Sequence, residues 1–572
     1  MKKLPYLILL FSFLAQVSFA QQSKISFTEA ELFSLGKTWG YLKYYHPVVS
    51  QGKLNSDSLL ISSLNAPKKI AVDATIASWL KQADDLKMDR PKVVAKVAHD
   101  SVDHRNFNLD WIKKDQLLSA KQKEVLFNLS KIPDAVGTFY SYGSNGRYGL
   151  SNEKNYPDTT AAHRLLGLFR FWNVIEYFYP YKYAIGNSWD ETLKKFIPTA
   201  IQAKDELSMA KFAAELAAAL NDTHAEVAPA PNDKIFGKLG PPFKFKVINR
   251  MVIITKIVNA DLCKKSNLEV GDVIGVIDGQ FVQDIIDQKS KYISSSNESV
   301  KIRDAFYYLF NGDGPKFSVQ GQKKNGVGFS VDVIRVKRNY NAEWDKEGAP
   351  ENKLIYYDPK LKRAVYSRIL NGNIGYVDRS SLAVKDLDSI MQTLKSTKGI
   401  IFDLRGYNDD GNLITLFNYI LKKPMMYAIK TQVNFSRPGT FLYRNHVAET
   451  PTGPLLTVGK ANPNAYSGKV ICLINESTQS AEEFWAMMFK TIPNVTFIGS
   501  QTAGADGNKT PVQFIGPYKI YMSGLGIYYP DGQETQRIGI IPDILVRPTA
   551  RNIQDGKDVL VDQAIDLIES LK

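Results

Sequence analysis

The spacing of apolar residues changes twice along the chain, so three kinds of structure are predicted. Up to about residue 235 the apolar positions recur at helical intervals, most clearly over residues 208–220. From residue 236 the pattern changes to the short alternating or apolar runs typical of strands, as in residues 243–247 and 251–254. From about residue 346 short apolar runs alternate with helical segments, which is typical of an α/β arrangement.

Two stretches of the helical part share one pattern at a constant offset. Residues 35–60 and 168–193 each read as an aromatic helix ended by proline, then a loop, then a second helix that begins near an aspartate. Trp39 corresponds to Trp172, 133 positions later (172 − 39), and the proline and the aspartate keep the same offset. We therefore predict two related helical modules that pack through aromatic faces.

The C-terminal part contains four short apolar runs that we predict to be strands, and three segments that we predict to be helices. The strands are expected at residues 374–377, 399–404, 470–474 and 495–499, and the helices at 382–394, 412–420 and 559–571.

The middle of the chain contains a recognisable hairpin. A Gly271-Asp272 turn between two β-branched runs is followed by an Asp278-Gly279 turn, and this arrangement resembles the central hairpin of PDZ domains. Such domains bind an extended peptide by strand addition and hold its C-terminal carboxylate with backbone amides. The segment from residue 240 to 340 has room for this domain with a helical insertion at about residues 295–310.

The first twenty residues predict the compartment. A basic start at Lys2 and Lys3, an apolar run over residues 4–17 and a small-x-small site ending at Ala20 are typical of a secretory signal peptide. We therefore expect an exported protein, periplasmic or secreted. No later run approaches the length of a membrane-spanning helix, so stable membrane insertion is not expected.

Together these patterns predict a multidomain α/β chain. The expected units are a signal peptide over residues 1–20, an N-terminal domain with the first helical repeat over 21–150, a helical domain over 151–235, a PDZ-like β-rich domain over 236–345 and an α/β domain over 346–572.

The composition argues against several classes of function. The formal net charge is +14, but lysines and arginines are dispersed among acids, so no nucleic-acid partner is predicted. Only two cysteines occur, and both Cys263 and Cys472 lie in apolar surroundings where buried thiols are expected instead of a disulfide scaffold. The six histidines show no metal-ligand spacing, so we expect neither a metal nor another cofactor.

Candidate chemistry begins where the apolar run 470–475 changes into small hydroxyl residues and then a helix. Such a turn exposes a side chain at the carboxyl end of a strand, and the helix start supplies backbone N–H groups for an oxyanion. Ser477 and Ser480 are both candidates for a nucleophile. Serine or threonine before glutamate is also the pattern of an ordinary helix cap.

Four sequence blocks, in their order along the chain, settle the choice of serine through a family resemblance. They are Asp403-Leu404-Arg405-Gly406, then Asn475-Glu476 with Ser480-Ala481 and Glu483, then Ile498-Gly499 with Thr502 and Gly504, and Gly539-Ile540 with Pro542-Asp543.

With the helical and PDZ-like segments, these blocks resemble the tail-specific or C-terminal processing serine proteases over about residues 160–572, and most closely the tricorn-like branch. The resemblance implies a crotonase-like ββα catalytic domain within residues 346–572, a peptide or protein substrate, and Ser480 as nucleophile with Ser477 in the preceding turn.

The chain departs from the processing proteases at the general base. Those enzymes place a lysine about 25 residues after the serine, and this position is Ala505, with Lys509 four residues further on. The tricorn-like branch instead uses a histidine from the helical domain, and His224 matches it. A histidine is suited to proton transfer near neutral pH.

The group that orients the histidine stays open. The tricorn-like pattern implies the hydroxyl of Thr223 and a glutamate shortly before Gly539. Spacing favours Gln536 and charge favours Glu534, with Asp531 also nearby.

The oxyanion would be bound by backbone N–H groups of Ala481 and of the loop that follows Asp403-Leu404-Arg405-Gly406, with Gly406 as the donor. That loop, residues 407–411, has fewer glycines than the family pattern. Asp403 and Arg405 are predicted to form a buried ion pair that supports the loop instead of taking part in the chemistry.

The function predicted from the sequence is an exported serine peptidase whose PDZ-like domain binds or gates the peptide, with capture of the substrate's C-terminus as one form of binding. The alternatives are a catalytically inactive peptide-binding or scaffold protein, and an esterase or amidase that acts on cell-envelope material.

Overall fold

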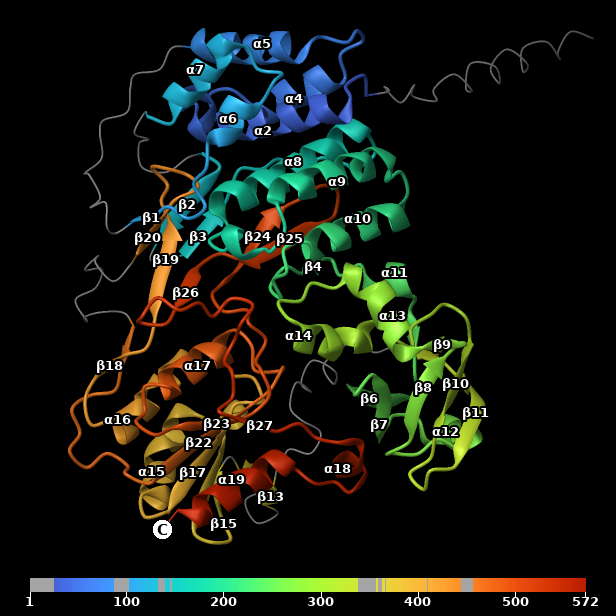
Figure 1. The fold of residues 1–572 in the computed structure, drawn as a ribbon, viewed down its shortest axis with the longest axis vertical. Helices are drawn as coiled ribbons and strands as arrows, with labels where there is room; N and C mark the ends of the chain where they lie inside the picture. Colours follow the sequence, from blue (N-terminus) through green and yellow to red (C-terminus); the bar gives the residue numbers. More distant parts are fainter. Residues whose placement is uncertain are drawn as a thin grey trace, which may run out of the picture.

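The computed structural model describes residues 25–86, 102–131, 139–144, 147–337, 356–358, 363–365, 367–408, 410–443 and 456–571. The predicted signal peptide and the predicted boundary between residues 345 and 346 lie outside these ranges. Three bodies are visible in Figure 1: helices at the top, a β-rich unit at the lower right and an α/β sheet at the lower left. The prediction of a multidomain α/β fold is confirmed.

The upper body consists of helices that belong to one continuous hydrophobic core. They are α2 (Glu29–Tyr45), α3 (Pro47–Ser50), α4 (Ser56–Leu64), α5 (Val72–Asp84), α6 (Asp110–Lys114), α7 (Ala120–Leu129), α8 (Ala161–Phe178), α9 (Trp189–Gln202) and α10 (Glu206–Ala218). Residues on both sides of position 150 contribute to this core, so the two predicted helical units pack as one body.

The internal repeat is visible in equivalent hydrogen bonds. Trp39 Nε1 donates to the carbonyl of Ser56 at 2.7 Å, and Trp172 Nε1 donates to the carbonyl of Trp189 at the same distance. Each bond ties the first helix of a module to the start of its second helix. The aromatic residues are therefore core residues, as the sequence predicted.

The two modules meet where α2 and α8 cross at equivalent positions. A side chain added at Gly40 would place its Cβ 1.9 Å from Cγ of Asn173, so only glycine allows this approach. Asn173 Nδ2 donates to the carbonyls of Gly36 and Phe169, at 3.0 and 2.8 Å. The crossing therefore depends on a small residue from one copy and an amide from the other.

The β-rich unit (residues 236–337) is a sheet in the order β11-β10-β8-β7-β6, covered by short helices. Its strands are β6 (Phe243–Ile248), β7 (Met251–Ile257), β8 (Val273–Ile277), β9 (Gln280–Phe281), β10 (Lys316–Gln322) and β11 (Gly328–Ile334), and its helices are α12 (Ala260–Lys265), α13 (Val282–Lys289) and α14 (Glu298–Arg303). The helical insertion expected at 295–310 is α14 followed by a 3₁₀ turn over Asp304–Tyr307.

The C-terminal body is a sheet in the order β15-β16-β17-β22-β23-β27, parallel except for the antiparallel β15. Its strands are β15 (Ser367–Leu370), β16 (Ile374–Asp378), β17 (Gly399–Asp403), β22 (Lys469–Ile474), β23 (Thr496–Gly499) and β27 (Ile544–Leu545). The four strands predicted from apolar runs are thus present.

Helices cover both faces of this sheet. Those on one face are α15 (Leu387–Leu394), α16 (Phe417–Ile420) and α17 (Ala481–Phe489), and α19 (Val559–Ser570) packs on the other. The helix predicted over 382–394 begins later, at Leu387, because two 3₁₀ turns precede it.

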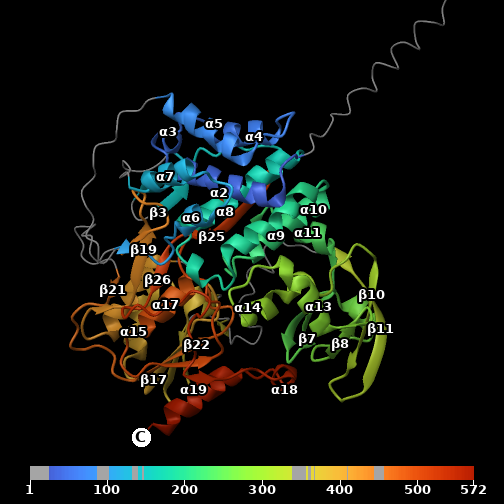
Figure 2. The ribbon, with the colours of Figure 1, turned by 45° about the horizontal axis from the view of Figure 1, so that its top comes forward.

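Strands from the C-terminal part of the chain join the helical body. β25 (Lys519–Ser523) pairs with β24 (Lys509–Gln513) on one side and with β4 (Val227–Ala228), just after the helices, on the other. Phe514 packs against Phe212 and Phe171, with ring centroids 5.3 and 6.5 Å apart. Figures 1 and 2 both show β25 close to α8 and α9.

A second small sheet makes a similar connection. It has the order β1-β20-β19-β26 and is formed by β1 (Val102–Asp103), β20 (Phe441–Tyr443), β19 (Ile429–Val433) and β26 (Gly526–Tyr528).

Within the described residues, no helix is both long and apolar enough to cross a membrane.

Candidate active site

Ser480 occupies a strained turn between β22 and α17. Its backbone has φ +56° and ψ −117°, which is rare for a residue other than glycine. Such a conformation costs on the order of 1–3 kcal/mol and persists only where the surrounding structure enforces it, most often at functional sites. A strained strand-to-helix turn is also the conformation that presents nucleophilic serines in α/β hydrolases.

Hydrogen bonds around the turn hold it in this conformation. The N–H of Ser480 donates to the carbonyl of Ala505 at 3.1 Å and to Oε2 of Glu483 at 3.2 Å. The buried Glu483 carboxylate also accepts from Thr502 Oγ1 at 2.5 Å, Gly504 N at 2.7 Å and Ala505 N at 2.9 Å. Burial raises the pKa of Glu483, and these hydrogen bonds oppose the rise. Glu483 thus fastens the loop at Thr502–Ala505 to the nucleophile turn.

The position where processing proteases carry a lysine is a buried alanine here. Ala505 has no base to offer, and only its main chain takes part in the turn. Lys509 forms an ion pair with Glu226 and lies 4.6 Å from the ring centroid of Tyr521. Its ammonium group is therefore engaged away from Ser480.

His224 follows α10 and is buried, with 4% of its surface exposed. Its main-chain N–H donates to Oδ1 of Asp222 at 3.0 Å, and its ring nitrogen Nδ1 lies 2.9 Å from Oγ of Ser523. Burial lowers the pKa of His224, and the Asp222 carboxylate partly opposes this change. The imidazole is therefore neutral at neutral pH, as a general base must be.

The carboxylate of Asp222 accepts several hydrogen bonds beside His224. Oδ2 accepts from the N–H of Ser523 at 2.8 Å, and Oδ1 accepts from its hydroxyl at 3.1 Å. The hydroxyl of Tyr179, at the end of α8, bonds to the same carboxylate. Sequence reasoning assigned no role to these three residues. Asp222 lies two residues before His224, whereas Ser523 carries no local sequence signal.

Thr223 faces the β-rich unit. Its N–H donates to Ser296 Oγ at 2.8 Å, its hydroxyl donates to the same oxygen at 2.9 Å, and the N–H of Ser296 donates back to Thr223 Oγ1 at 3.0 Å. These bonds attach the loop carrying His224 to the segment before α14. The structure does not bring the Thr223 hydroxyl to the His224 ring.

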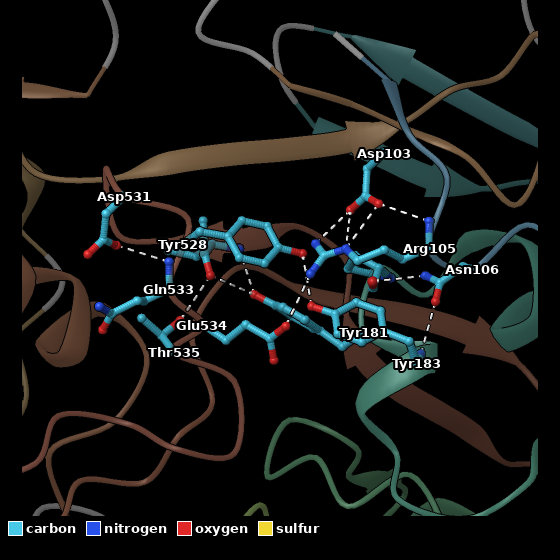
Figure 3. Close-up of polar contacts among 12 residues, drawn as sticks. Asp103, Arg105, Asn106, Tyr181, Tyr183, Tyr528, Asp531, Gln533, Glu534 and Thr535 are labelled. Carbon is cyan, nitrogen blue, oxygen red and sulfur yellow. Dashed lines mark hydrogen bonds and ion pairs between the residues drawn. The ribbon is translucent and has the colours of Figure 1, made fainter. Parts of the chain in front are cut away.

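Glu534 lies in a different cluster, shown in Figure 3. Its Oε1 accepts from Arg105 Nη1 at 3.1 Å, and the Arg105 guanidinium lies 4.2 and 5.1 Å from the ring centroids of Tyr183 and Tyr528. The carboxylate of Asp531 accepts from the N–H of Gln533 in the same loop. The structure therefore brings neither acid to His224.

Gln536 is buried, and its Nε2 lies 3.5 Å from the hydroxyl of Tyr179. Because Tyr179 bonds to Asp222, Gln536 is connected to the His224 corner through two intermediates. It does not contact the imidazole directly.

Among the described residues, no hydrogen bond joins Ser480 Oγ to His224. One loop nevertheless contacts both Ser480 and the segment next to Ser523, the partner of His224. The carbonyl of Ala505 accepts from Ser480, and the carbonyl of Asn508, three residues on, accepts at 2.8 Å from the N–H of Gly524, which follows Ser523. A histidine in this arrangement can remove a proton from Ser480 once the ring and the hydroxyl come into hydrogen-bond reach.

One backbone donor is adjacent to Ser480, and the loop that carries Gly406 is held against the same helix start. Ala481 is the first residue of α17, and its N–H has no partner within the helix. The loop after Gly406 is attached to Glu482, the residue after Ala481. The Glu482 carboxylate accepts a hydrogen bond from Asn408 N at 2.7 Å. Arg379 pairs with Glu482 and donates to the carbonyl of Asn408 at 2.8 Å. These contacts fix the Gly406 loop against the start of α17.

The predicted ion pair of Asp403 and Arg405 is confirmed. The two side chains are buried and 2.8 Å apart, and Arg405 also pairs with Asp558 at 2.7 Å. Cys263 and Cys472 are free and buried, as expected, and burial raises the pKa of both thiols. Within the described residues, no group of three or more His, Cys, Asp and Glu side chains could hold a metal ion.

Comparison with known proteins agrees with the fold of the C-terminal body. Residues 373–546 match the model of Peptidase family S41. Tricorn protease of Thermoplasma acidophilum is 25% identical over 217 residues, which are 37% of this chain and 18% of tricorn protease. The chain thus spans less than a fifth of the length of that relative.

Similar folds also occur among solved structures. Mature CPAF complexed with lactacystin has a TM-score of 0.53 at 16% identity, over 72% of this chain and 98% of CPAF. A second crystal structure of mature CPAF has a TM-score of 0.54 at 15% identity, over 72% of this chain and 97% of CPAF.

Over residues 373–546 the chain matches Peptidase family S41, and it is similar to the tail-specific and C-terminal processing serine peptidases. The resemblance inferred from the four sequence blocks is confirmed.

Proposed function

We propose that the protein is an exported peptidase in which Ser480 is the nucleophile and His224 the general base. The observation that carries this proposal is the strained backbone of Ser480 at the start of α17, inside a domain of family S41. A buried neutral histidine, held at Nδ1 by Ser523, supports it. Export rests on the basic, apolar and small-residue pattern of residues 1–20.

The proposed reaction follows from these groups. Ser480 Oγ attacks the carbonyl carbon of a peptide bond while His224 Nε2 accepts the serine proton. The N–H groups of Ala481 and Gly406 stabilise the negative charge on the tetrahedral oxygen. His224 then gives its proton to the leaving amine, and water releases the acyl group by the reverse sequence.

The β-rich unit is proposed to bind or gate the peptide, because one of its segments contacts the Thr502 loop and the turn before Ser480. Asn297 Nδ2 donates to the carbonyls of Thr502 and Ala503, at 2.8 and 3.1 Å. Arg303 Nη1 donates to the carbonyl of Glu476 at 2.8 Å and to Gln479 Oε1 at 2.9 Å. A peptide bound to this unit could therefore change the position of the nucleophile turn.

A catalytically inactive peptide-binding protein is the second candidate. The observation that favours it is the lack of a hydrogen bond between Ser480 and His224 within the described residues. Hydrolysis of cell-envelope esters or amides would use the same nucleophile, and a panel of ester, amide and peptide substrates separates it from peptidase activity.

The test is covalent labelling with a fluorophosphonate probe, which reacts with activated serines. We expect labelling of the wild type that Ser480→Ala abolishes and that His224→Ala reduces by about 100-fold or more. Lactacystin, the compound complexed with mature CPAF, is a second compound to test for binding. A folded wild type that stays unlabelled between about pH 6 and 9 with peptide present would instead support the inactive protein.

A further inference from the structure

We infer that Ser523 and Asp222 form a relay that positions His224 for proton transfer. This inference rests on the proposed function and deepens it, because it names the groups that orient the base. Ser523 is a positioning residue in this scheme, and Asp222 acts through it. Neither Thr223 nor Glu534 takes that part.

The donors and acceptors fix the direction of the relay. Asp222 offers only acceptors when ionised, so the Ser523 hydroxyl, 3.1 Å from Oδ1, uses its single proton there. A lone pair of Ser523 Oγ then faces Nδ1 of His224 at 2.9 Å, and this nitrogen must carry the proton. The other ring nitrogen, Nε2, is left with a free lone pair, which is the form that accepts a proton from serine.

Burial makes this geometry rigid. Asp222 and Ser523 are both 0% exposed, so water cannot substitute for a lost partner. The carboxylate receives the N–H of His224, the N–H and hydroxyl of Ser523, and the hydroxyl of Tyr179. This set of donors compensates for burying the negative charge.

Strand pairing brings the relay together. His224 lies three residues before β4, and Ile520 of β25 pairs with Val227 of β4. The end of β25 therefore reaches the histidine loop, although Ser523 is 299 positions away in the sequence. The same paired strands fix the distance between Ser523 and the carboxylate.

In this relay Gln536 does not orient His224 directly. Gln536 Nε2 lies 3.5 Å from the Tyr179 hydroxyl, and that hydroxyl bonds to Asp222. An amide suffices at this distance from the imidazole, because the negative charge is supplied by Asp222.

The first experiment removes single side-chain hydroxyl groups, one in each variant. Ser523→Ala is expected to lower kcat by about tenfold or more with little change in KM. Thr510→Val is the matched control, because it removes another buried hydroxyl from the neighbouring strand β24 and should retain the wild-type kcat. Loss of kcat in Thr223→Val together with full kcat in Ser523→Ala would overturn the relay.

The second experiment uses the charges that face His224, which are Asp222, Glu226 and Lys509. Asp222 raises the pKa of His224, so Asp222→Asn should move the acidic limb of kcat/KM to lower pH. Lys509 lowers that pKa and neutralises Glu226, so Lys509→Ala should move the limb to higher pH. A limb that stays in place in Asp222→Asn contradicts the relay.

The third measurement needs no variant of the relay. Nitrogen NMR of histidine-labelled wild type at about pH 8 should show His224 with its proton on Nδ1. His224→Ala identifies the signal. A proton on Nε2 would overturn the inference whether or not peptides are cleaved, whereas activity retained in Ser480→Ala would overturn the proposed function alone.

Discussion

At the scale of single residues, Ser480 shows how the site uses strain. An L side chain is disfavoured at φ +56° and ψ −117°, yet the Ser480 N–H bonds to Ala505 and Glu483 hold it there. The unfavourable backbone persists because these hydrogen bonds and the loop at Thr502–Ala505 enforce it. This backbone is the physical difference between a nucleophile turn and a helix cap, whose residue has an ordinary extended backbone.

This strain predicts a stability difference between two inactive variants. Ser480→Gly should be more stable than Ser480→Ala by about 1–2 kcal/mol, because only glycine adopts a positive φ without penalty. Urea denaturation of the two proteins measures the difference. Equal stabilities, or a more stable alanine variant, would show that the turn relaxes and is not strained.

At the scale of elements, the segment before and within α14 links the β-rich unit to the site. Ser294 Oγ donates to the carbonyl of Ala225 at 2.5 Å, next to His224. Asn297 caps α14 and also donates to the loop at Thr502. One short segment thus contacts the two neighbours of His224, the loop at Thr502 and the turn before Ser480.

Arg303 provides the most direct test of this link. Arg303→Met removes its bonds to Glu476 and Gln479, so the labelling rate of Ser480 by fluorophosphonate should fall about tenfold. Lys301→Met is the matched control, since among the described residues the ion pair of Lys301 is with the exposed Glu298. Equal labelling rates in the two variants would mean that the β-rich unit does not support the nucleophile turn.

At the scale of the whole molecule, the catalytic sheet and the helices are not independent. The hydrophobic core of the helices includes residues from the C-terminal part, among them Phe514, Ile520 and Met522. His224 follows the helices of this shared core, whereas Ser480 precedes α17, whose buried residues belong to the core of the sheet. We therefore expect activity to require the full assembly.

A truncated chain tests this dependence. A fragment of residues 367–571 lacks His224 and exposes Phe514, Ile520 and Met522, so we expect it to be poorly folded and unlabelled by fluorophosphonate. Size-exclusion chromatography and labelling beside the full chain measure both properties. A folded fragment labelled at the full-chain rate would show that neither the helices nor His224 is required.

Much of the fold, and the Ser480 part of the candidate site, could be predicted from the sequence alone. Apolar periodicity reports which faces of a segment are buried, so the strands and helices around Ser480 were predicted correctly within a few residues. The nucleophile turn was found because a strand, a turn and a helix start are contiguous in the sequence. The 133-residue repeat was likewise visible in local patterns.

Only the tertiary structure decided the surroundings of His224. Ser523 reaches it through the pairing of β25 with β4, and no local pattern reports a partner 299 positions away. Glu534 is occupied by Arg105, which lies 429 positions earlier, so charge alone could not choose the orienting group. The sequence thus supplied the candidate residues, and long-range strand pairing determined which of them meet.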